Sequence, residues 1–570
     1  MKLIKKNIFL ILIIFLAVIL RFINLSSIPI GFNDDEAAFG YNAYSILKTG
    51  RDEWGRLLPF PVFESFGDWK LVGYLYLAVI SQAILGVNEF ATRLPSAIFG
   101  VLAVWATYLL TKELFRNFNL KLKIGNWKLE IAHVAAFFLA ISPWHIIASR
   151  NAFESDILIF IISLSTYFFL LSLKIKKFII FAFLGLVSAF YIYRSSWLFV
   201  PLFVLNLLYL HRERLKNFKT DLKKTILLSF VLLLPLIPVV TTFKGQARFF
   251  QESFIAGVQK SGIIDEVNEK LGACQDKWPN FFCKLIYNRY DSYFTRYINN
   301  YFSNLSPELF YLRGVSGGYQ AFSIRSLFYS FELPLLIIGL FFLISKKPYQ
   351  AKILIPWILL VPLGASITGV GNPGRLNILI PTTQIIAAFG YFSIYNLIKS
   401  QKVANLILII SAIFIVSVVA RLVVDMFSYY PLVSGRYQRY GYKPLFDYLE
   451  SQKPKYNQIA VSRKNDDAKQ YIHYLFFEQY DPKAYQESVL RYVDQRGWQV
   501  VEQVGNFRFY PSTPGLENLP PKTLLAVGEK EVVFPIGPIF VVNYKNGDRV
   551  FEVYDVDMVK EKMKEKYEQK

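Results

Sequence analysis

The sequence predicts a mainly α-helical bundle that crosses a membrane many times and carries a small extracytoplasmic α/β domain at its C-terminal end. Of the 570 residues, 54% are hydrophobic and 18% are charged, whereas globular domains average about 25% charged residues. The mean hydropathy is +0.33, although the last third of the chain has the composition of a soluble domain. The aromatic content of 17% excludes a disordered chain, because disordered segments are poor in aromatic residues. The apolar part therefore belongs in a membrane.

Apolar stretches of span length support the same conclusion. Crossing about 30 Å of hydrocarbon takes roughly 20 helical residues at 1.5 Å each. The first stretch follows Lys2, Lys5 and Lys6 and is not followed by a small-residue cleavage site, so we interpret it as a retained helix. We predict about eleven spans, at residues 7–25, 90–114, 131–148, 156–173, 178–193, 197–210, 225–243, 328–344, 353–368, 376–398 and 403–424.

The basic residues indicate the orientation of the spans. If the apolar run at residues 71–86 does not cross the membrane, all the Lys and Arg clusters lie on the same side as the N-terminus. A helix of that length reaches only about 24 Å, which is short for a crossing. Positively charged loops favour the cytoplasm, so we predict a cytoplasmic N-terminus with basic loops facing anionic lipids. This placement explains the net charge of +21 without a nucleic-acid partner. The clusters lie at residues 112–128, 174–177, 212–224, 346–352 and 399–402.

This topology predicts a transmembrane domain at residues 1–427, with long exterior loops at 26–89 and 244–327, and an extracytoplasmic domain at 428–570. The second loop holds both cysteines, Cys274 and Cys283. In an oxidising compartment they form either a disulfide or two free thiols, and two thiols cannot build a zinc or iron–sulfur framework. Helical patterns at 443–452, 467–479 and 483–496 alternate with β-rich runs at 458–462, 499–504, 532–534 and 539–542, which is typical of an α/β domain.

The first exterior loop begins with three consecutive acids, Asp34, Asp35 and Glu36, soon after the first span. Residues 37–48 have a helical pattern, so the acids lie at a helix N-terminus, where the helix dipole favours negative charge. Acids at the membrane surface are also candidates for function. The two interpretations are compatible, because the dipole keeps a carboxylate ionised and oriented.

Further charged and aromatic residues gather at the exterior ends of the spans. Lys70 precedes the short apolar run, where it is either a snorkelling anchor or the counter-ion of a phosphate. The aromatic residues form an interfacial belt or cover the faces of a sugar. Cations that grip phosphate and carboxylates that take a hydroxyl proton suit an anionic lipid headgroup with a polyhydroxylated ligand. We assign substrate binding to Asp34, Tyr41, Trp69, Lys70, Arg150, Glu154, Arg194 and Arg375.

Several of these motifs together resemble the GT-C superfamily of membrane glycosyltransferases over roughly residues 1–400. The most similar family is family 39, which contains the protein O-mannosyltransferase-like enzymes and the lipid A aminoarabinose transferases. The motifs that carry the resemblance are Pro29-Ile30-Gly31-Phe32-Asn33-Asp34-Asp35-Glu36-Ala37, Gly40-Tyr41-Asn42-Ala43, Asp68-Trp69-Lys70, Glu89-Phe90-Ala91-Thr92-Arg93-Leu94-Pro95-Ser96 and Ser142-Pro143-Trp144-His145.

The resemblance implies a polyprenyl-phosphate-linked sugar donor and transfer with inversion at the exterior face. The family's Asp-Glu motif falls on Asp35 and Glu36, which we predict to be catalytic, and its phosphate-binding lysine falls on Lys70. The carboxylate of the second exterior turn falls on Glu154, where some members have Asp, and an arginine before a late helix falls on Arg375. The family lysine is usually followed by prolines, whereas Leu71 and Val72 follow it here, so the local loop shape is expected to differ.

The expected mechanism is a single displacement. Asp35 accepts the acceptor's proton while the hydroxyl attacks the anomeric carbon, and a saccharide is expected to lie between Asp35 and Lys70. Fixed cations stabilise the departing phosphate: Lys70, with Arg150, Arg194 or Arg375 as helpers. No cofactor is required, although a divalent metal at the acids stays an open alternative. The acceptor is a hydroxyl of a lipid, a protein or a cell-wall polymer, and membrane lipids are the remaining partners.

Two other function classes are consistent with the composition. A transporter or flippase of lipid-linked saccharide would need charged groups along the interior of many spans and often shows repeat symmetry. The predicted spans are nearly free of charge, which favours a one-sided enzyme. A receptor or scaffold would use the C-terminal domain and leave the first loop inert.

Overall fold

The computed structural model describes residues 2–118, 121–124, 127–242, 252–256, 259–313, 326–464, 469–494 and 498–568. They form two compact units that alternate along the chain. The helical unit comprises Met1–Ile23 and Ser96–Val423, and the mixed unit comprises Asn24–Pro95 and Val424–Lys570. The first loop therefore groups with the C-terminal residues, whereas the sequence analysis placed it in the transmembrane domain.

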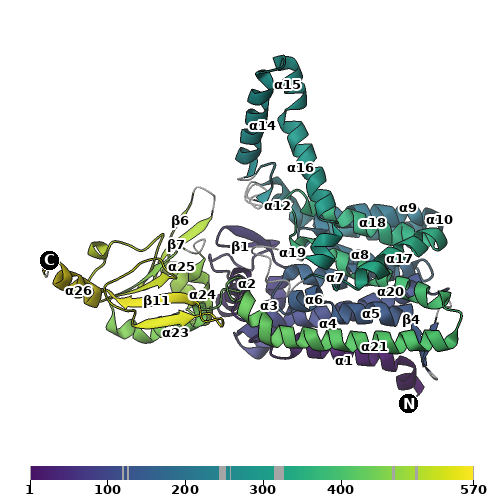
Figure 1. The fold of residues 1–570 in the computed structure, drawn as a ribbon, viewed down its shortest axis with the longest axis horizontal. Helices are drawn as coiled ribbons and strands as arrows, with labels where there is room; N and C mark the ends of the chain where they lie inside the picture. Colours follow the sequence, from purple (N-terminus) through teal and green to yellow (C-terminus); the bar gives the residue numbers. More distant parts are fainter. Residues whose placement is uncertain are drawn as a thin grey trace. The chain divides into compact units, whose positions relative to one another are not determined.

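The helical unit is an assembly of apolar helices (Figure 1). Among the described residues, six helices are long and apolar enough to cross a membrane, or seven if the bent pair α5 and α6 forms one span. Its helices are α1 (Lys2–Phe22), α4 (Glu89–Leu114, which begins in the mixed unit), α5 (Ile131–Ile141), α6 (Pro143–Ser149), α7 (Glu154–Ser172), α8 (Phe178–Ala189), α9 (Ser196–Leu210), α10 (Arg212–Leu215), α11 (Lys219–Leu233), α12 (Ile237–Thr241), α14 (Gln259–Gln275), α15 (Asn280–Ile286), α16 (Arg289–Ser303), α17 (Glu332–Lys346), α18 (Pro348–Ala365), α19 (Pro373–Leu376), α20 (Ile380–Leu397) and α21 (Gln401–Val424), and a hairpin joins β3 (Lys121–Ile124) to β4 (Trp127–Glu130).

Every one of the eleven predicted spans overlaps a helix, but several of these helices, such as α8 and α9, are shorter than a full crossing. The number of spans stays a prediction. The run at residues 71–86 forms α3 (Gly73–Leu85) within the mixed unit, and its 13 residues extend about 20 Å, which is short of the hydrocarbon thickness.

Two glycines let α17 and α20 pack backbone against backbone. A Cβ atom on Gly339 would lie 2.1 Å from the Ile386 carbonyl oxygen, and one on Gly390 would lie 2.0 Å from the Leu335 carbonyl oxygen. Larger side chains would force the helices apart. Small residues serve the same purpose in other membrane helix pairs, where close van der Waals packing drives association.

The mixed unit is built around a seven-stranded sheet of order β10-β11-β9-β5-β8-β7-β6, with β5 parallel to β8 and β9 and the other pairs antiparallel. A separate hairpin pairs β1 with β2. The elements are α2 (Asp34–Thr49), β1 (Val62–Ser65), β2 (Asp68–Leu71), α3, α22 (Tyr430–Ser434), α23 (Tyr442–Gln452), β5 (Gln458–Ser462), α24 (Gln470–Phe477), α25 (Pro482–Ser488), β6 (Leu490–Val493), β7 (Gln499–Val504), β8 (Phe507–Tyr510), β9 (Thr523–Gly528), β10 (Phe540–Asn543), β11 (Arg549–Asp555) and α26 (Val556–Glu568).

The α/β character predicted for the C-terminal residues is confirmed, with local errors. The helix predicted at 483–496 ends at Ser488, and Leu490–Val493 pairs with β7 as an edge strand, because cross-strand pairing overrides a local helical pattern. No strand forms at 532–534, and β8, β9, β11 and α26 were not predicted. The predicted helix at 467–479 corresponds to α24, although residues 465–468 lie outside the described residues.

One hydrophobic core joins the first loop to the C-terminal residues. It contains Phe32, Ala37 and Tyr41 from the first loop together with Phe446 and Phe476, all nearly or fully buried. The prediction that Tyr41 binds substrate is wrong. Its ring is fully buried in this core, and its hydroxyl donates a hydrogen bond to the Tyr480 carbonyl oxygen at 3.1 Å.

The second loop contains a helical hairpin, α14–α15–α16, with a disulfide between Cys274 and Cys283. The disulfide settles the alternative that the sequence left open for these two cysteines. Residues 244–251, 257–258 and 314–325 of this predicted loop lie outside the described residues.

The shared core predicts that Tyr41 supports both parts of the mixed unit. We expect Tyr41→Ala to lower its local stability by about 3–5 kcal/mol, as for other large aromatic truncations, whereas Tyr41→Phe loses one hydrogen bond worth about 1 kcal/mol. Hydrogen exchange should show residues 24–95 and 424–570 losing protection together in Tyr41→Ala. Loss confined to the first loop would contradict the shared core.

Candidate active site

The three acids of the first loop occupy the first turn of α2. Asn33 caps this helix: its side-chain oxygen accepts from the Glu36 backbone N–H at 3.0 Å, and the Asn33 N–H donates to Glu36 Oε2 at 3.1 Å. This reciprocal capping box satisfies two helix-end N–H groups. The predicted helix at residues 37–48 is thus confirmed, with the acids at its N-terminus.

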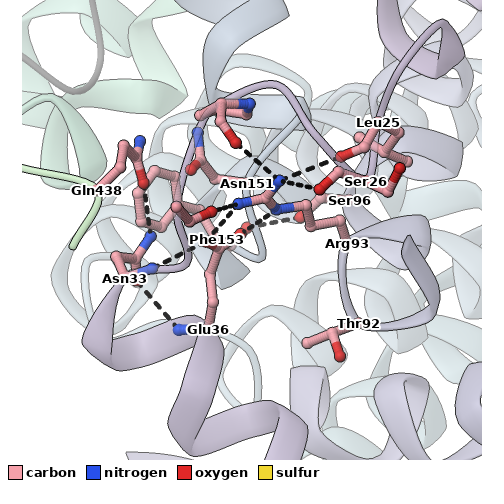
Figure 2. A network of polar contacts seen from close by, with 12 residues as sticks. Leu25, Ser26, Asn33, Glu36, Thr92, Arg93, Ser96, Asn151, Phe153 and Gln438 are labelled. Carbon is pink, nitrogen blue, oxygen red and sulfur yellow. Dashed lines mark hydrogen bonds and ion pairs between the residues drawn. The ribbon is translucent and has the colours of Figure 1, made fainter. Parts of the chain in front are cut away.

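Glu36 and Arg93 form a fully buried ion pair (Figure 2). Arg93 Nε donates to Glu36 Oε1 at 2.8 Å and Nη2 donates to Oε2 at 3.0 Å. The same guanidinium donates to the carbonyl oxygens of Leu25, Pro29 and Gly31, so it gathers the chain before α2 around one cation. Both Glu36 oxygens are engaged, and we therefore assign Glu36 a positioning role in place of the predicted catalytic role. Arg93 lies in a motif that carried the family resemblance, but no sequence pattern indicated that it pairs with Glu36.

Lys70, on β2, contacts Asp35, the acid that we predicted to be catalytic. Its Nζ donates to Asp35 Oδ1 at 2.6 Å and to Asp68 Oδ2 at 2.7 Å. The Lys70 side chain is 1% exposed and that of Asp35 is 40% exposed, so a buried ammonium is paired with a carboxylate that reaches solvent. The Phe66 ring lies 5.1 Å from the ammonium, within the range of a cation–π contact.

The predicted pairing of Asp35 with Lys70 is present, and the two groups lie closer together than the prediction of a saccharide between them implied. The two groups contact each other directly in this structure, so a saccharide between them requires the two side chains to separate. The physical reason for the direct contact is desolvation, because a buried ammonium needs anionic partners.

Asp34 is bound by the C-terminal part of the mixed unit. Arg439 donates to both of its oxygens at 3.1 Å, and His473 Nε2 lies 3.1 Å from Oδ1. Burial alone would raise the pKa of Asp34, but Arg439, Lys469 and His473 together hold that pKa well below its usual value. These partners occupy the Asp34 carboxylate in this structure, and its predicted contact with substrate stays a prediction.

Other groups of the first loop support the hairpin that carries Lys70. Trp69 is half-buried beneath the Arg56 guanidinium, which lies 4.4 Å from the ring centre and also pairs with Glu64. Burial raises the pKa of Glu53 to about 8, so this fully buried carboxyl keeps its proton at neutral pH. Trp69 stays a predicted substrate contact.

The other predicted site residues belong to the helical unit. Arg150 is fully buried and donates to the carbonyl oxygens of Leu20 at 3.0 Å and Ile23 at 2.7 Å. It therefore caps the C-terminal end of α1, where unsatisfied carbonyls attract a cation. The predicted role of Arg150 as a phosphate helper stays a prediction.

Glu154, Arg194 and Arg375 lie at helix ends of the same unit. Glu154 is the buried first residue of α7, and Arg375, on α19, pairs with Glu252 and Thr368. Asn377 donates to the Ser155 hydroxyl at 3.0 Å, which brings the start of α7 beside α19. Arg194 stacks on Trp197 with 5.6 Å between the guanidinium and the ring centre.

A buried polar group of the helical unit was missed by the sequence analysis. Arg21 Nη2 donates to His145 Nδ1 at 2.8 Å, and His145 Nε2 lies 3.6 Å from Asp156 Oδ1, with all three side chains fully buried. The sequence signal for this group is Arg21, a charged residue at the end of an apolar run. Charged residues in membrane segments are rare and usually paired. Among the residues that the structure describes, no group of three or more His, Cys, Asp or Glu is placed to hold a metal ion.

Comparisons with known proteins identify the fold. Residues 72–241 match the family described as dolichyl-phosphate-mannose-protein mannosyltransferase. The whole chain is similar to ArnT from Cupriavidus metallidurans in the apo state, with a TM-score of 0.53 and 12% identity over 96% of this chain and 98% of that one. The chain has the GT-C glycosyltransferase fold. The predicted resemblance and the predicted fold class are thereby confirmed, and the chain is a multi-pass membrane protein.

Further solved structures are similar to a lesser degree. The oligosaccharyltransferase AglB from Archaeoglobus fulgidus, in complex with an inhibitory peptide and a dolichol-phosphate, gives a TM-score of 0.46 and 13% identity over 83% of this chain and 63% of that one. ArnT from Cupriavidus metallidurans bound to undecaprenyl phosphate gives a TM-score of 0.42 and 13% identity over 84% and 78%. No curated protein matches the sequence.

The Glu36–Arg93 contact predicts strong coupling between the two side chains. Breaking a buried ion pair leaves an unpaired charge and costs about 3–5 kcal/mol, so Glu36→Gln and Arg93→Gln should each sharply reduce hydrogen-exchange protection of α2. The double variant should cost less than the sum of the two. A matched control is Lys443→Gln, which breaks an exposed pair with Glu89 and should cost less than about 1 kcal/mol. Additive single effects would contradict the coupling.

The raised pKa of Glu53 predicts a pH-dependent stability. Its carboxyl titrates near 4.5 in the unfolded chain and at about 8 in the folded one, so the folded state holds the extra proton between these values. The mixed unit should therefore lose stability as the pH rises through this window. Glu53→Gln should flatten the profile, whereas Glu502→Gln, at an exposed position, should not. An unchanged slope in Glu53→Gln would refute this assignment.

Proposed function

We propose that this chain is an integral-membrane, inverting glycosyltransferase that moves a sugar from a polyprenyl-phosphate-linked donor to a hydroxyl acceptor on the extracytoplasmic face. The observation that carries the proposal is the Lys70 ammonium, buried and held at 2.6 Å from Asp35 and 2.7 Å from Asp68. A cation for a phosphate and a solvent-reaching carboxylate for a hydroxyl proton are thus placed side by side. The matched family is described as dolichyl-phosphate-mannose-protein mannosyltransferase. This description names a lipid-phosphate-linked sugar as the donor.

The contact between Lys70 and Asp35 suggests how the donor engages. A donor phosphate at Lys70 would replace Asp35 as the partner of the ammonium, while Asp68 keeps its contact. Asp35 would then be released toward the acceptor. This exchange supplies an anion for the buried cation at every stage, which avoids the cost of an unpaired charge.

The displacement itself needs one base and one fixed cation. The acceptor oxygen bonds to the anomeric carbon, the bond from that carbon to the phosphate oxygen breaks, and the acceptor proton passes to Asp35. Lys70 stabilises the polyprenyl phosphate that leaves, because a prepositioned cation needs no reorganisation as charge develops. Asp34 and Glu36 position α2, so Asp35 is held between two acids whose oxygens are already bound.

The predicted orientation is also part of the proposal. A cytoplasmic N-terminus follows from the basic loops, and the Cys274–Cys283 disulfide suits an oxidising compartment for the second loop. The chain passes between the units after Ile23, Pro95 and Val423. If all eleven predicted spans cross, these three points share one side, which is the extracytoplasmic side.

A transporter of lipid-linked saccharide is supported less well. Transport needs polar groups along the interior of the spans. The buried group Arg21, His145 and Asp156 lies in the last turn of α1, on α6 and in the first turn of α7, so it marks helix ends and not a path through the bundle.

The proposed function is tested by transfer from a panel of polyprenyl-phosphate sugars in purified, reconstituted protein, with products identified by mass spectrometry. Asp35→Asn should lower turnover by about 10²–10⁴-fold, the usual contribution of a general base, and leave membrane insertion intact. Lys70→Ala should weaken donor use, whereas Lys443→Ala, at an exposed lysine of the same unit, should leave it unchanged. Wild-type turnover in Asp35→Asn, or movement of intact donor lipid without transfer, would overturn the proposal.

A further inference from the structure

The helical hairpin of the second loop is a well-defined substructure of the helical unit. Helices α14 and α16 pack through Ile263, Val267, Tyr293 and Tyr297, and the disulfide links the end of α14 to α15. The short helix α15 forms the end of the hairpin remote from α18 (Figure 1). A disulfide-bonded hairpin with its own small core keeps its outer surface in a fixed shape.

That outer surface is strongly apolar at α15. The side chains at this end are more than half exposed, from 54% for Phe282 to 72% for Phe281. The exposed surface continues along α16 with Tyr290 at 69% and Phe294 at 66%, which lie on one helix face because they are four residues apart. We call this surface the aromatic edge; it consists of Trp278, Phe281, Phe282, Leu285, Ile286, Tyr290 and Phe294. Contiguous exposed apolar patches of this kind mark protein or membrane contacts.

The depth of the hairpin follows from its attachment to α18, one of the helices long and apolar enough to cross a membrane. Tyr301 Oη donates to the Leu359 carbonyl oxygen at 2.9 Å, and Tyr297 Oη donates to that of Leu363 at 3.1 Å. Leu359 precedes the helix end at Ala365 by about 9 Å. The second half of α16 therefore lies beside the last two turns of a spanning helix, where hydrocarbon gives way to headgroups.

The direction of α16 keeps the hairpin near that level. It does not run parallel to α18 in Figure 1, so it leaves the bundle sideways and does not continue along the axis of the span. An amphipathic helix with aromatic residues on one face and basic residues nearby is typical of a segment lying in the membrane interface, and Trp and Tyr are enriched at this level.

Charge separates the two sides of the hairpin. The segment that follows α14, from Asp276 to Arg296, carries the four basic residues Lys277, Lys284, Arg289 and Arg296 against the two acids Asp276 and Asp291, a net charge of +2. Helix α14 carries the acids Asp265, Glu266 and Glu269 against Lys260 and Lys270, a net charge of −1. Anionic headgroups therefore attract the segment after α14 more than α14 itself, and this segment also carries the exposed apolar side chains.

We propose that the aromatic edge inserts into the membrane leaflet reached by the C-terminal end of α18, and that its basic residues bind anionic headgroups. The hairpin is then an interfacial anchor extending sideways from the bundle, with α14 facing water. This inference is independent of the proposed catalytic activity.

Photocrosslinking in the full-length protein tests the anchor. Phe281 or Tyr290 is replaced by p-benzoylphenylalanine, which preserves an aromatic side chain at an exposed position, and the protein is reconstituted in nanodiscs of phosphatidylcholine and phosphatidylglycerol. The matched control places the same residue at Glu269, exposed on α14. An intact Cys274–Cys283 disulfide confirms the fold of each variant.

After irradiation, mass spectrometry should show lipid adducts at positions 281 and 290 in several-fold excess over position 269. Phosphatidylglycerol should exceed its share of the membrane among these adducts. Adducts to a second copy of the chain, equal lipid adducts at position 269, or no lipid adduct at 281 and 290 would each overturn the anchor. Adducts that follow the bulk lipid composition would overturn the headgroup preference.

Discussion

The buried ion pair between Glu36 and Arg93 is the contact on which the candidate site depends. Two charges removed from water are costly unless their hydrogen bonds are complete, and here the guanidinium also binds the carbonyl oxygens of the chain before α2. The pair therefore fixes the start of α2, the segment that precedes it and the start of α4 at once. This arrangement also positions Asp35, because Asp35 directly precedes Glu36 in the same helical turn.

The C-terminal residues take part in the same arrangement. Arg439 and His473 bind Asp34, and Phe476 packs so closely on Gly40 that a Cβ there would lie 2.4 Å from its ring. The first loop and the C-terminal segments of the mixed unit thus share one core and one charge network. In this chain the α/β sheet serves as the scaffold of α2, a role that its sequence alone did not indicate.

Sequence patterns predicted local features well and distant contacts poorly. The helical pattern after Glu36 and the apolar runs gave α2 and the helices of the bundle, because periodicity reflects a buried face. The contact of Asp35 with Lys70 was expected from family resemblance, although not its direct geometry. Tyr41 was misassigned because nothing local distinguishes a core tyrosine from a sugar-stacking one. The partner of Asp34 lies 405 residues away in sequence, and no periodicity encodes that distance.

The alternation of the two units along the chain has a consequence for biosynthesis. Residues 24–95 share their core with residues that begin at Val424, so ribosomes must translate the whole stretch between them first. At the usual rate of about 5–20 residues per second, this takes roughly 20–60 s. During that interval Asp34 lacks its C-terminal cations Arg439 and Lys469, and Phe32 and Tyr41 lack the aromatic partners Phe476 and Tyr485. The first loop of a nascent chain therefore lacks its packing and charge partners until the last quarter of the chain has been synthesised. During this time we expect the loop to be exposed to chaperones and proteases that act on incompletely folded membrane proteins.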